Sequence, residues 1–367
     1  MRNLSLRRAV SAAALTAFAL ALAACGGDGG GNLTDPPVPP DDSPPADDPP
    51  QAPAPVGDVI YALDNGNRLL VFGTESGSTV SRLVGISGMP ILKRMIGIDF
   101  RPSDRRLYGV GNDSRVYVID TLSGAATPVG SGPFSPAIIS SFDVHFGMDF
   151  DPATDRIRLI SNELGGNWSI DPDDGTAVAG QSPRYAAGDA NEGKIPHIGG
   201  LTYMPASAIP TASALHRRMA SLAAAASGPC EDLLWAMDTE LSNMITSCDA
   251  DSGDWSTLGP IDGITSLACV ELDYSGPGGG IWAAGQGIND AFNSIGTVDP
   301  ESGKIDWKIN VPDNWLIQSI TFEPKAAPVG VRAEPAAFRL SEKTISSSVA
   351  GEPAGDPVAL CRGAGGS

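Results

Sequence analysis

The sequence predicts an all-β protein: a five-bladed β-propeller-like repeat with one short helical insertion, its ring closed by pairing the C-terminal strand with the first blade. Three observations predict this fold. A short motif recurs five times, each copy except the last is followed by three further strand-like segments, and the two ends of the array hold complementary parts of one unit. Four strands per unit and a period of about 40–50 residues are typical of propeller blades.

The first 24 residues have the pattern of a secretory signal peptide. Three arginines precede an apolar stretch from Ala9 to Ala21, which is too short for the roughly 20 residues that span a bilayer. The next segment, Leu22-Ala23-Ala24-Cys25, resembles the bacterial lipobox. This resemblance implies cleavage before Cys25, diacylglycerol on its sulfur and a further acyl chain, such as palmitate, on the new N-terminus. We therefore expect a lipoprotein anchored in a membrane of the cell envelope.

Gly26, not aspartate, follows the lipidated cysteine. By resemblance to enterobacterial sorting, this implies the outer membrane where the organism has one. Residues 25–57 then form a stalk, because residues 26–57 contain ten Pro, six Asp and no Lys or Arg. In polyproline II geometry, at about 3.1 Å per residue, the stalk could reach on the order of 100 Å.

The charge of the chain bears on its partners. Removal of the signal peptide leaves 21 basic against 43 acidic residues, a net charge of −22. Nucleic acid is therefore disfavoured as a partner, because binding it needs a basic surface.

The propeller-like domain is expected over residues 58–324. Its repeated motif is a large apolar residue, Asp or Thr, an aromatic residue, a variable residue and proline. The copies are Ile98–Pro102, Met148–Pro152, Leu201–Pro205, Ile320–Pro324 and a looser copy at Leu272–Tyr274 with its proline at Pro277. The spacings are 50, 53, 71 and 48 residues, and the longest contains an Ala- and Leu-rich insertion at 205–229 that predicts a helix. Residues 325–367 lose the pattern and predict a flexible tail.

Ring closure follows from the two ends of the array. Residues 59–84 hold three strands of a unit without the opening strand, whereas residues 319–324 are an opening strand with no followers. Pairing the two completes a blade and leaves only short, protected sheet edges.

Three segments resemble a known family: GIDFRPSDRRLYGVGNDSRVYVIDTLSGAATPVGSGPF at 97–134, GMDFDPATDRIRLIS at 147–161 and YAAGDANEGKIPHIGGLTY at 185–203. They are similar to the bacterial domain of unknown function 4394 (DUF4394) family, over about residues 59–324. The resemblance implies a repeat β-fold in secreted or surface proteins. It implies no activity and no catalytic residues.

The second motif position carries Asp99, Asp149, Thr202, Asp273 and Thr321. A ring of ligands around a channel is one interpretation. A polar residue between large apolar ones on an inner strand more commonly accepts hydrogen bonds from a neighbouring turn, and we expect that structural role. The acidic segments at 171–175, 249–253 and 299–303 lack the spacing of calcium loops, and we expect them to be hairpin turns.

Ligand-binding residues are expected on the connections from each outer strand to the next inner strand, which gather at one face around the channel mouth. Two of the three histidines lie there. The candidates are Asp143, His145, Asp189, Asn191, His197 and Trp315, with the 185–198 loop within reach of Asp143 and His145. The alternative is that Gly188–Asn191 is a capped turn and the histidines are incidental.

Four cysteines follow the lipidated one and pass through an oxidising compartment, where disulfides are the default. Cys230 and Cys248 flank one predicted hairpin and are the favoured pair; the pairing of Cys269 and Cys361 is left open.

Hydrolase, Walker and clustered metal-ligand motifs are absent from the sequence. We therefore expect a non-enzymatic envelope module that needs no cofactor and binds an unknown protein, glycan or small ligand at the channel mouth. The alternative is a calcium-dependent enzyme resembling the propeller lactonases, a class of hydrolase, and the propeller lyases. Its metal would be held by Asp143, Asp189, Asn191 or a histidine.

Overall fold

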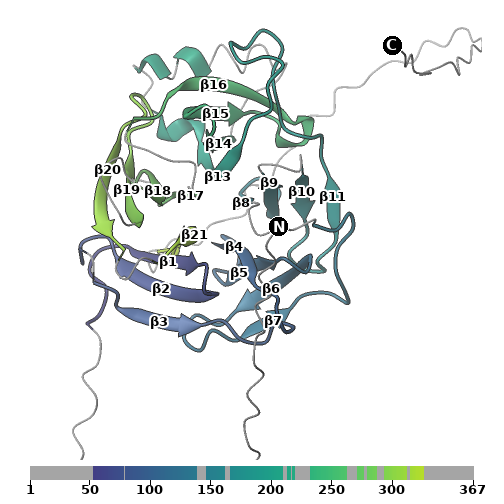
Figure 1. Cartoon of the computed structure of the whole chain (residues 1–367), viewed down its shortest axis with the longest axis vertical. Coiled ribbons are helices and arrows are strands. Elements are labelled where there is room, and N and C mark those ends of the chain that lie inside the picture. Colours follow the sequence, from purple (N-terminus) through teal and green to yellow (C-terminus); the bar gives the residue numbers. More distant parts are fainter. Residues whose placement is uncertain are drawn as a thin grey trace, which may run out of the picture. The chain divides into compact units, whose positions relative to one another are not determined.

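The computed structural model describes residues 53–77, 79–138, 146–161, 166–209, 213–215, 217–219, 232–262, 271–276, 279–286, 293–311 and 315–325. These residues form five small β-sheets arranged around a common axis (Figure 1). The fold is a five-bladed β-propeller, as the repeated motif predicts.

Each blade is an antiparallel sheet whose strands run in order from the axis outward. Blade 1 contains β21 (Ile317–Phe322), β1 (Val59–Asp64), β2 (Arg68–Gly73) and β3 (Arg82–Gly85). Blade 2 contains β4 (Met95–Phe100), β5 (Leu107–Gly111), β6 (Arg115–Ile119) and β7 (Ala126–Pro128). Blade 3 contains β8 (Phe146–Asp151), β9 (Arg156–Ser161), β10 (Asn167–Ile170) and β11 (Ala177–Ala179).

Blade 4 contains β13 (Ile198–Pro205), β14 (Asp232–Asp238), β15 (Asn243–Ser247) and β16 (Asp254–Pro260). A short strand, β12 (Arg184–Tyr185), pairs in parallel with its outer edge. Blade 5 contains β17 (Glu271–Tyr274), β18 (Ile281–Gln286), β19 (Asn293–Val298) and β20 (Ile305–Asn310). Four strands per blade agree with the sequence pattern, and β12 is an addition that the pattern did not indicate.

The C-terminal strand closes the ring. β21 pairs antiparallel with β1, in a register that places Ile60 opposite Phe322 and Ala62 opposite Ile320. Both Ile320 and Phe322 are buried. The prediction that the two ends of the array share one blade is therefore confirmed.

Five hydrophobic clusters hold the ring together, and each lies between two neighbouring blades. Close packing near the axis depends on glycine. A Cβ on Gly97 would lie 2.7 Å from the Cβ of Met148 in the next blade, and one on Gly147 would lie 2.9 Å from the backbone nitrogen of Leu201. Both distances are shorter than real Cβ contacts, so these glycines let the innermost strands approach one another.

The acidic hairpin segments are turns, as expected. Asp171, Asp249 and Asp299 each accept a hydrogen bond from the backbone N–H two residues later, at 2.9–3.0 Å. Each turn ends in a glycine with φ between 70° and 74°, a conformation that costs a side-chain-bearing residue free energy.

The insertion after β13 is partly described. Ala206–Ala208 forms a 3-10 helix, and residues 214, 215 and 217–219 are helical. Leu215 and Met219 are buried in the cluster between blades 4 and 5, so this part of the insertion packs against the rim of the propeller. Within the described ranges, no helix is both long enough and apolar enough to cross a membrane.

Candidate functional site

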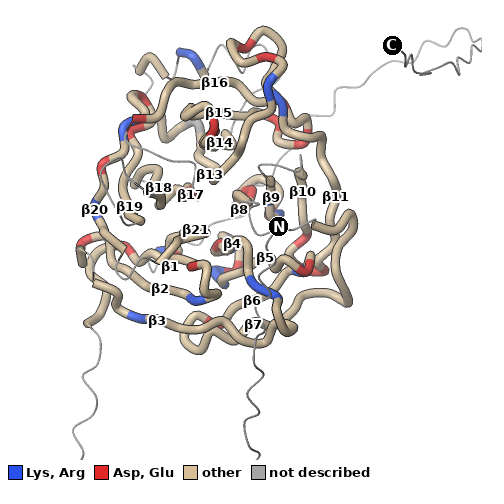
Figure 2. The backbone as a smooth tube through the Cα atoms, in the orientation of Figure 1, with Lys and Arg blue, Asp and Glu red and all other residues tan. Residues whose placement is uncertain are grey.

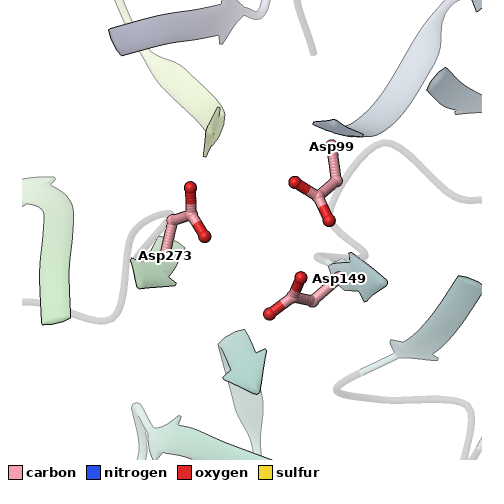
Figure 3. A group of neighbouring side chains, drawn as sticks. All are labelled: Asp99, Asp149 and Asp273. Carbon is pink, nitrogen blue, oxygen red and sulfur yellow. The ribbon is translucent and has the colours of Figure 1, made fainter. Parts of the chain in front are cut away.

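Three carboxylates converge near the carboxyl ends of the innermost strands. Asp99, Asp149 and Asp273 come from β4, β8 and β17, and their side chains point toward one another (Figure 3). One oxygen from each lies within 4.8 Å of the others. The three residues are only 6–8% exposed. Figure 2 shows acidic positions near the axis of the ring as well as at its outer edge.

Backbone N–H groups hold these side chains in place. At four of the five blade boundaries, the Asp or Thr of one innermost strand accepts a hydrogen bond from the aromatic residue of the next strand. The pairs are Asp99 with Phe150 (2.8 Å), Asp149 with Tyr203 (2.5 Å), Asp273 with Phe322 (2.7 Å) and Thr321 with Phe100 (3.3 Å). The expected structural role is thus present, although the donors belong to a neighbouring strand and not to a turn.

The fifth boundary lacks this bond. Its acceptor would be Thr202, which the repeat places between Asp149 and Asp273 in the ring. The backbone N–H of Tyr274 instead donates to the carboxylate of its own neighbour, Asp273, at 2.7 Å. Thr202 is fully buried, and its Oγ1 has no hydrogen-bond partner among the described residues. The ring therefore carries one buried oxygen with spare hydrogen-bonding and coordinating capacity.

Burial and mutual repulsion make ionisation of this cluster costly. Burial raises the pKa of Asp99, and it raises the pKa of Asp149 and Asp273 well above the ordinary value, with repulsion from Asp99 as the next cause for both. Glu271, two residues before Asp273 on β17, has its pKa raised in the same way by burial and then by Asp273. Its Oε2 has no partner within the described part of the chain.

Basic side chains do not compensate this charge. None of the ion pairs between described residues involves Asp99, Asp149 or Asp273. Arg101 lies just beyond the motif aspartate but pairs with Asp155 and Asp173 of the next blade, at 2.8 and 2.6 Å. Among the described residues, therefore, no basic side chain forms an ion pair with the three aspartates.

The three carboxylates line a cavity of about 460 Å³, here called the funnel, and the part of the lining that they form is called its floor. Its wall consists of the motif's own aromatic and proline residues: Phe100, Phe150, Tyr203, Tyr274, Phe322, Pro102, Pro152, Pro205 and Pro324. Lys325 also contributes to the lining, and its Nζ pairs with Asp58 at 3.0 Å. A cavity of this size, apolar at the sides with polar groups converging at one point, is typical of a small-ligand site.

The funnel lies at the opposite end of the innermost strands from the loops on which the sequence placed its candidates. On those loops, Asp189 accepts hydrogen bonds from the backbone N–H and Oγ1 of Thr257, and Asn191 donates to the same hydroxyl. His197 contacts Glu240 at 3.0 Å. Asp189 and Asn191 thus come together to brace the loop against β16.

Trp315 lies apart from these loop residues in the chain and the fold, just before β21, with the guanidinium of Arg68 over its ring. Asp143 and His145 lie outside the described residues, so their approach to the 185–198 loop stays a prediction. Of the predicted disulfide, Cys248 is disulfide-bonded. Its favoured partner, Cys230, also lies outside the described residues, as does the lipidation site Cys25.

The sequence did contain a signal for the funnel. Three of the five equivalent motif positions are acidic, and closing a ring of five brings equivalent positions close to one axis. The expected structural role leaves room for a second one, because carboxylates can accept backbone hydrogen bonds and still keep free lone pairs.

Comparison with known proteins places the fold in a family. The model of the family described as "Domain of unknown function (DUF4394)" matches residues 68–321. The chain belongs to this family. The residues that match the DUF4394 model include all the described strands of blades 2–5 and most of blade 1. No curated protein matches the chain.

Solved structures similar to this DUF4394 protein share little sequence with it. A protein of unknown function from Bacteroides caccae is 7% identical with a TM-score of 0.40, covering 73% of this chain and 100% of its own. A putative 6-phosphogluconolactonase from Bacteroides uniformis is 13% identical with a TM-score of 0.34, covering 73% and 72%. An inactive virginiamycin B lyase from Staphylococcus aureus, solved with quinupristin, is 11% identical with a TM-score of 0.34, covering 70% and 72%. Likenesses this distant say nothing about activity.

Proposed function

We propose that this protein is a lipid-anchored binding module of the cell envelope, and that it takes a positively charged ligand into the funnel at the carboxyl ends of its innermost strands. The observation that carries the proposal is the buried cluster of Asp99, Asp149 and Asp273 at the floor of an open cavity. The lipobox-like segment ending in Cys25 and the proline-rich stalk support its display on a membrane, the outer membrane where there is one.

Charge complementarity identifies the class of ligand. Buried carboxylates without countercharges are destabilised by the loss of hydration and by one another. A cation relieves both costs, whereas an anion would add to them. The aromatic and proline wall leaves room beside the cation for an apolar or hydroxylated body, which fits the small ligand expected from the sequence.

A melting-temperature screen tests this proposal. Calcium, magnesium, manganese, spermidine, arginine amide and choline would each be added to the purified domain at constant ionic strength. At a concentration of 100 times the dissociation constant, a ligand stabilises the folded state by about 2.7 kcal/mol, which corresponds to roughly 5–10 °C for a domain of this size. We expect at least one of these cations to raise the melting temperature.

A substitution at the funnel rim supplies the matched control. Pro152→Arg adds a positive charge to the wall and should reduce the shift. Leu122→Arg adds the same charge on an exposed turn, where Leu122 is 72% exposed, and should leave the shift unchanged. The proposal fails if no cation in the screen stabilises the wild type, or if Pro152→Arg and Leu122→Arg respond alike.

A further inference from the structure

We propose that the floor of the funnel is a site for one divalent metal ion of the size of calcium, held by Asp99, Asp149 and Asp273 with the hydroxyl of Thr202 beside them. This inference rests on the proposed function, which requires only that a cation of some kind binds there. It goes further by naming an inorganic ion and its ligands.

The spacing of the carboxylates suits one coordination sphere. Calcium binds oxygen ligands at about 2.3–2.6 Å, so two oxygens on opposite sides of the ion lie about 4.6–5.2 Å apart. One oxygen each from Asp99, Asp149 and Asp273 lie within 4.8 Å of one another. Three oxygens spread evenly around one such ion lie about 4.0–4.5 Å apart, so small side-chain rotations bring all three into contact with the same ion. Three carboxylate oxygens, with water from the open funnel, supply the hard ligands that calcium prefers.

The hydrogen bonds to the carboxylates orient them without using all their lone pairs. A carboxylate has about four lone-pair sites. Asp149 is the least occupied, because its Oδ2 accepts the N–H of Tyr203 and no backbone N–H of the described residues donates to its Oδ1. Backbone donors of this kind fix the geometry of metal ligands in the way that outer-shell partners do. The site is thus held in place by the same bonds that join the blades.

Thr202 provides an observation independent of the acidic cluster. Buried hydroxyls normally have a hydrogen-bond partner, because leaving one unpaired costs about 1–3 kcal/mol. Thr202 Oγ1 lies at the one ring boundary where the inter-strand bond is missing, and it has no partner among the described residues. A metal ion, or a water bound to it, between Asp149 and Asp273 would satisfy this oxygen.

Glu271, two residues before Asp273 on β17, is a second buried side chain with an unpartnered oxygen among the described residues. It is 2% exposed, and its Oε2 is also unpartnered within the described ranges. Residues two apart on a strand share a face, so Glu271 lies on the side of the strand that carries Asp273. A water molecule bound to the ion would offer Glu271 Oε2 the hydrogen-bond donor that it lacks among the described residues.

Charge favours a metal over an organic ammonium group. Burial raises the pKa of Asp99, Asp149 and Asp273, so these carboxyls ionise together only when a cation offsets their charges. A divalent ion offsets two of these negative charges and contacts all three carboxylates as a single atom. An ammonium or guanidinium group offsets one and must also fit its own substituents among the aromatic side chains.

Calcium titration of chelator-stripped protein by isothermal calorimetry tests the inference. We expect one ion per chain, with a dissociation constant of about 1 mM or below, the range of extracellular calcium modules or tighter. Asp149→Asn keeps an acceptor for the N–H of Tyr203 and offers an amide N–H to Asp99. It should weaken calcium binding at least tenfold while leaving the metal-free protein as stable as the wild type.

Two further variants separate charge from geometry. Asp120→Asn removes one negative charge from an exposed turn and should bind calcium like the wild type. Thr202→Val keeps the shape of the side chain, removes only the unpartnered hydroxyl and should weaken calcium binding several-fold. Because the Thr202 hydroxyl has no hydrogen-bond partner in the described part of the chain, this variant tests the site even if Asp149→Asn does not fold.

The inference is overturned if stripped wild-type protein binds neither calcium, magnesium nor manganese, or if both Asp149→Asn and Thr202→Val bind calcium as the wild type does. Equal losses in Asp120→Asn and Asp149→Asn would also overturn it, since binding would then follow net charge. If the metals fail but spermidine or arginine amide still stabilises the wild type, the proposed function stands and only the metal assignment falls.

Discussion

Ending the chain at Asp313 should abolish cooperative folding, whereas ending it at Lys325 should leave the melting temperature within a few degrees of the full chain. The two shortened chains differ by twelve residues that contain β21. This strand is the innermost strand of blade 1, and its loss would expose the inner edge of β1 and open the ring.

The free energy of folding lost with β21 is comparable to the whole folding free energy of a typical domain. Ile317, Ile320 and Phe322 are all at least 92% buried. At about 1.5–3 kcal/mol for each buried side chain, their removal costs about 5–9 kcal/mol, against a typical total of 5–15 kcal/mol. β21 also supplies Thr321, which bonds to Asp99, and the N–H of Phe322, which bonds to Asp273.

Circular dichroism melts and limited proteolysis would measure the difference. A synthetic peptide of residues 314–325 added to the shorter chain should restore protease resistance. The peptide can replace the missing strand because β21 is held in blade 1 by non-covalent pairing with β1. A shorter chain that melts cooperatively near the full-length temperature would refute the ring closure as a source of stability.

In the metal-free protein, stability should rise as the pH falls from about 8 to 5. The folded-state pKa values of Asp149, Asp273 and Glu271 are raised well above their ordinary values. A carboxyl whose pKa is raised on folding contributes stability that is fully present below its unfolded pKa, about 4, and is lost as the pH rises through its folded pKa. Uptake of one proton changes the free energy of unfolding by about 1.4 kcal/mol per pH unit, or roughly 3–6 °C.

Calcium should remove this dependence, because a bound cation favours the ionised carboxylates. Melting temperatures measured from pH 5 to 8, with chelator and with calcium, should therefore diverge most at pH 8. Below about pH 4 the trend should reverse, since hydrogen bonding lowers the pKa of surface carboxyls such as Asp299 beside Ser302. A metal-free stability that is flat or rises between pH 5 and 8 would contradict the burial of ionisable groups described for the floor.

The fold could be predicted from the sequence because one motif indicates both where a strand ends and how many blades the ring contains. The Asp or Thr, the aromatic residue and the proline mark the end of each innermost strand, and their spacing gives the number of blades. The split first blade was visible as three strands near Val59 and one near Ile320. The strand β12 was missed because two residues, Arg184 and Tyr185, carry no periodicity.

The candidate site was harder to predict because it depends on distances across the axis. Loop composition pointed to Asp189, whose carboxylate the structure uses to hold Thr257. The repeat placed Asp99 and Asp149 at equivalent positions, but only the ring radius, set in part by Gly97 and Gly147, shows that these carboxylates meet. A single blade contains no sign of that convergence.

An anomalous-difference map from crystals grown with manganese tests the account most directly. Manganese shares the preference of calcium for oxygen ligands and gives a strong anomalous signal. We predict one peak between the carboxylates of Asp99, Asp149 and Asp273, within about 2.6 Å of an oxygen from each. An empty funnel floor in crystals that hold manganese elsewhere, or the same peak in Asp149→Asn crystals, would contradict the account.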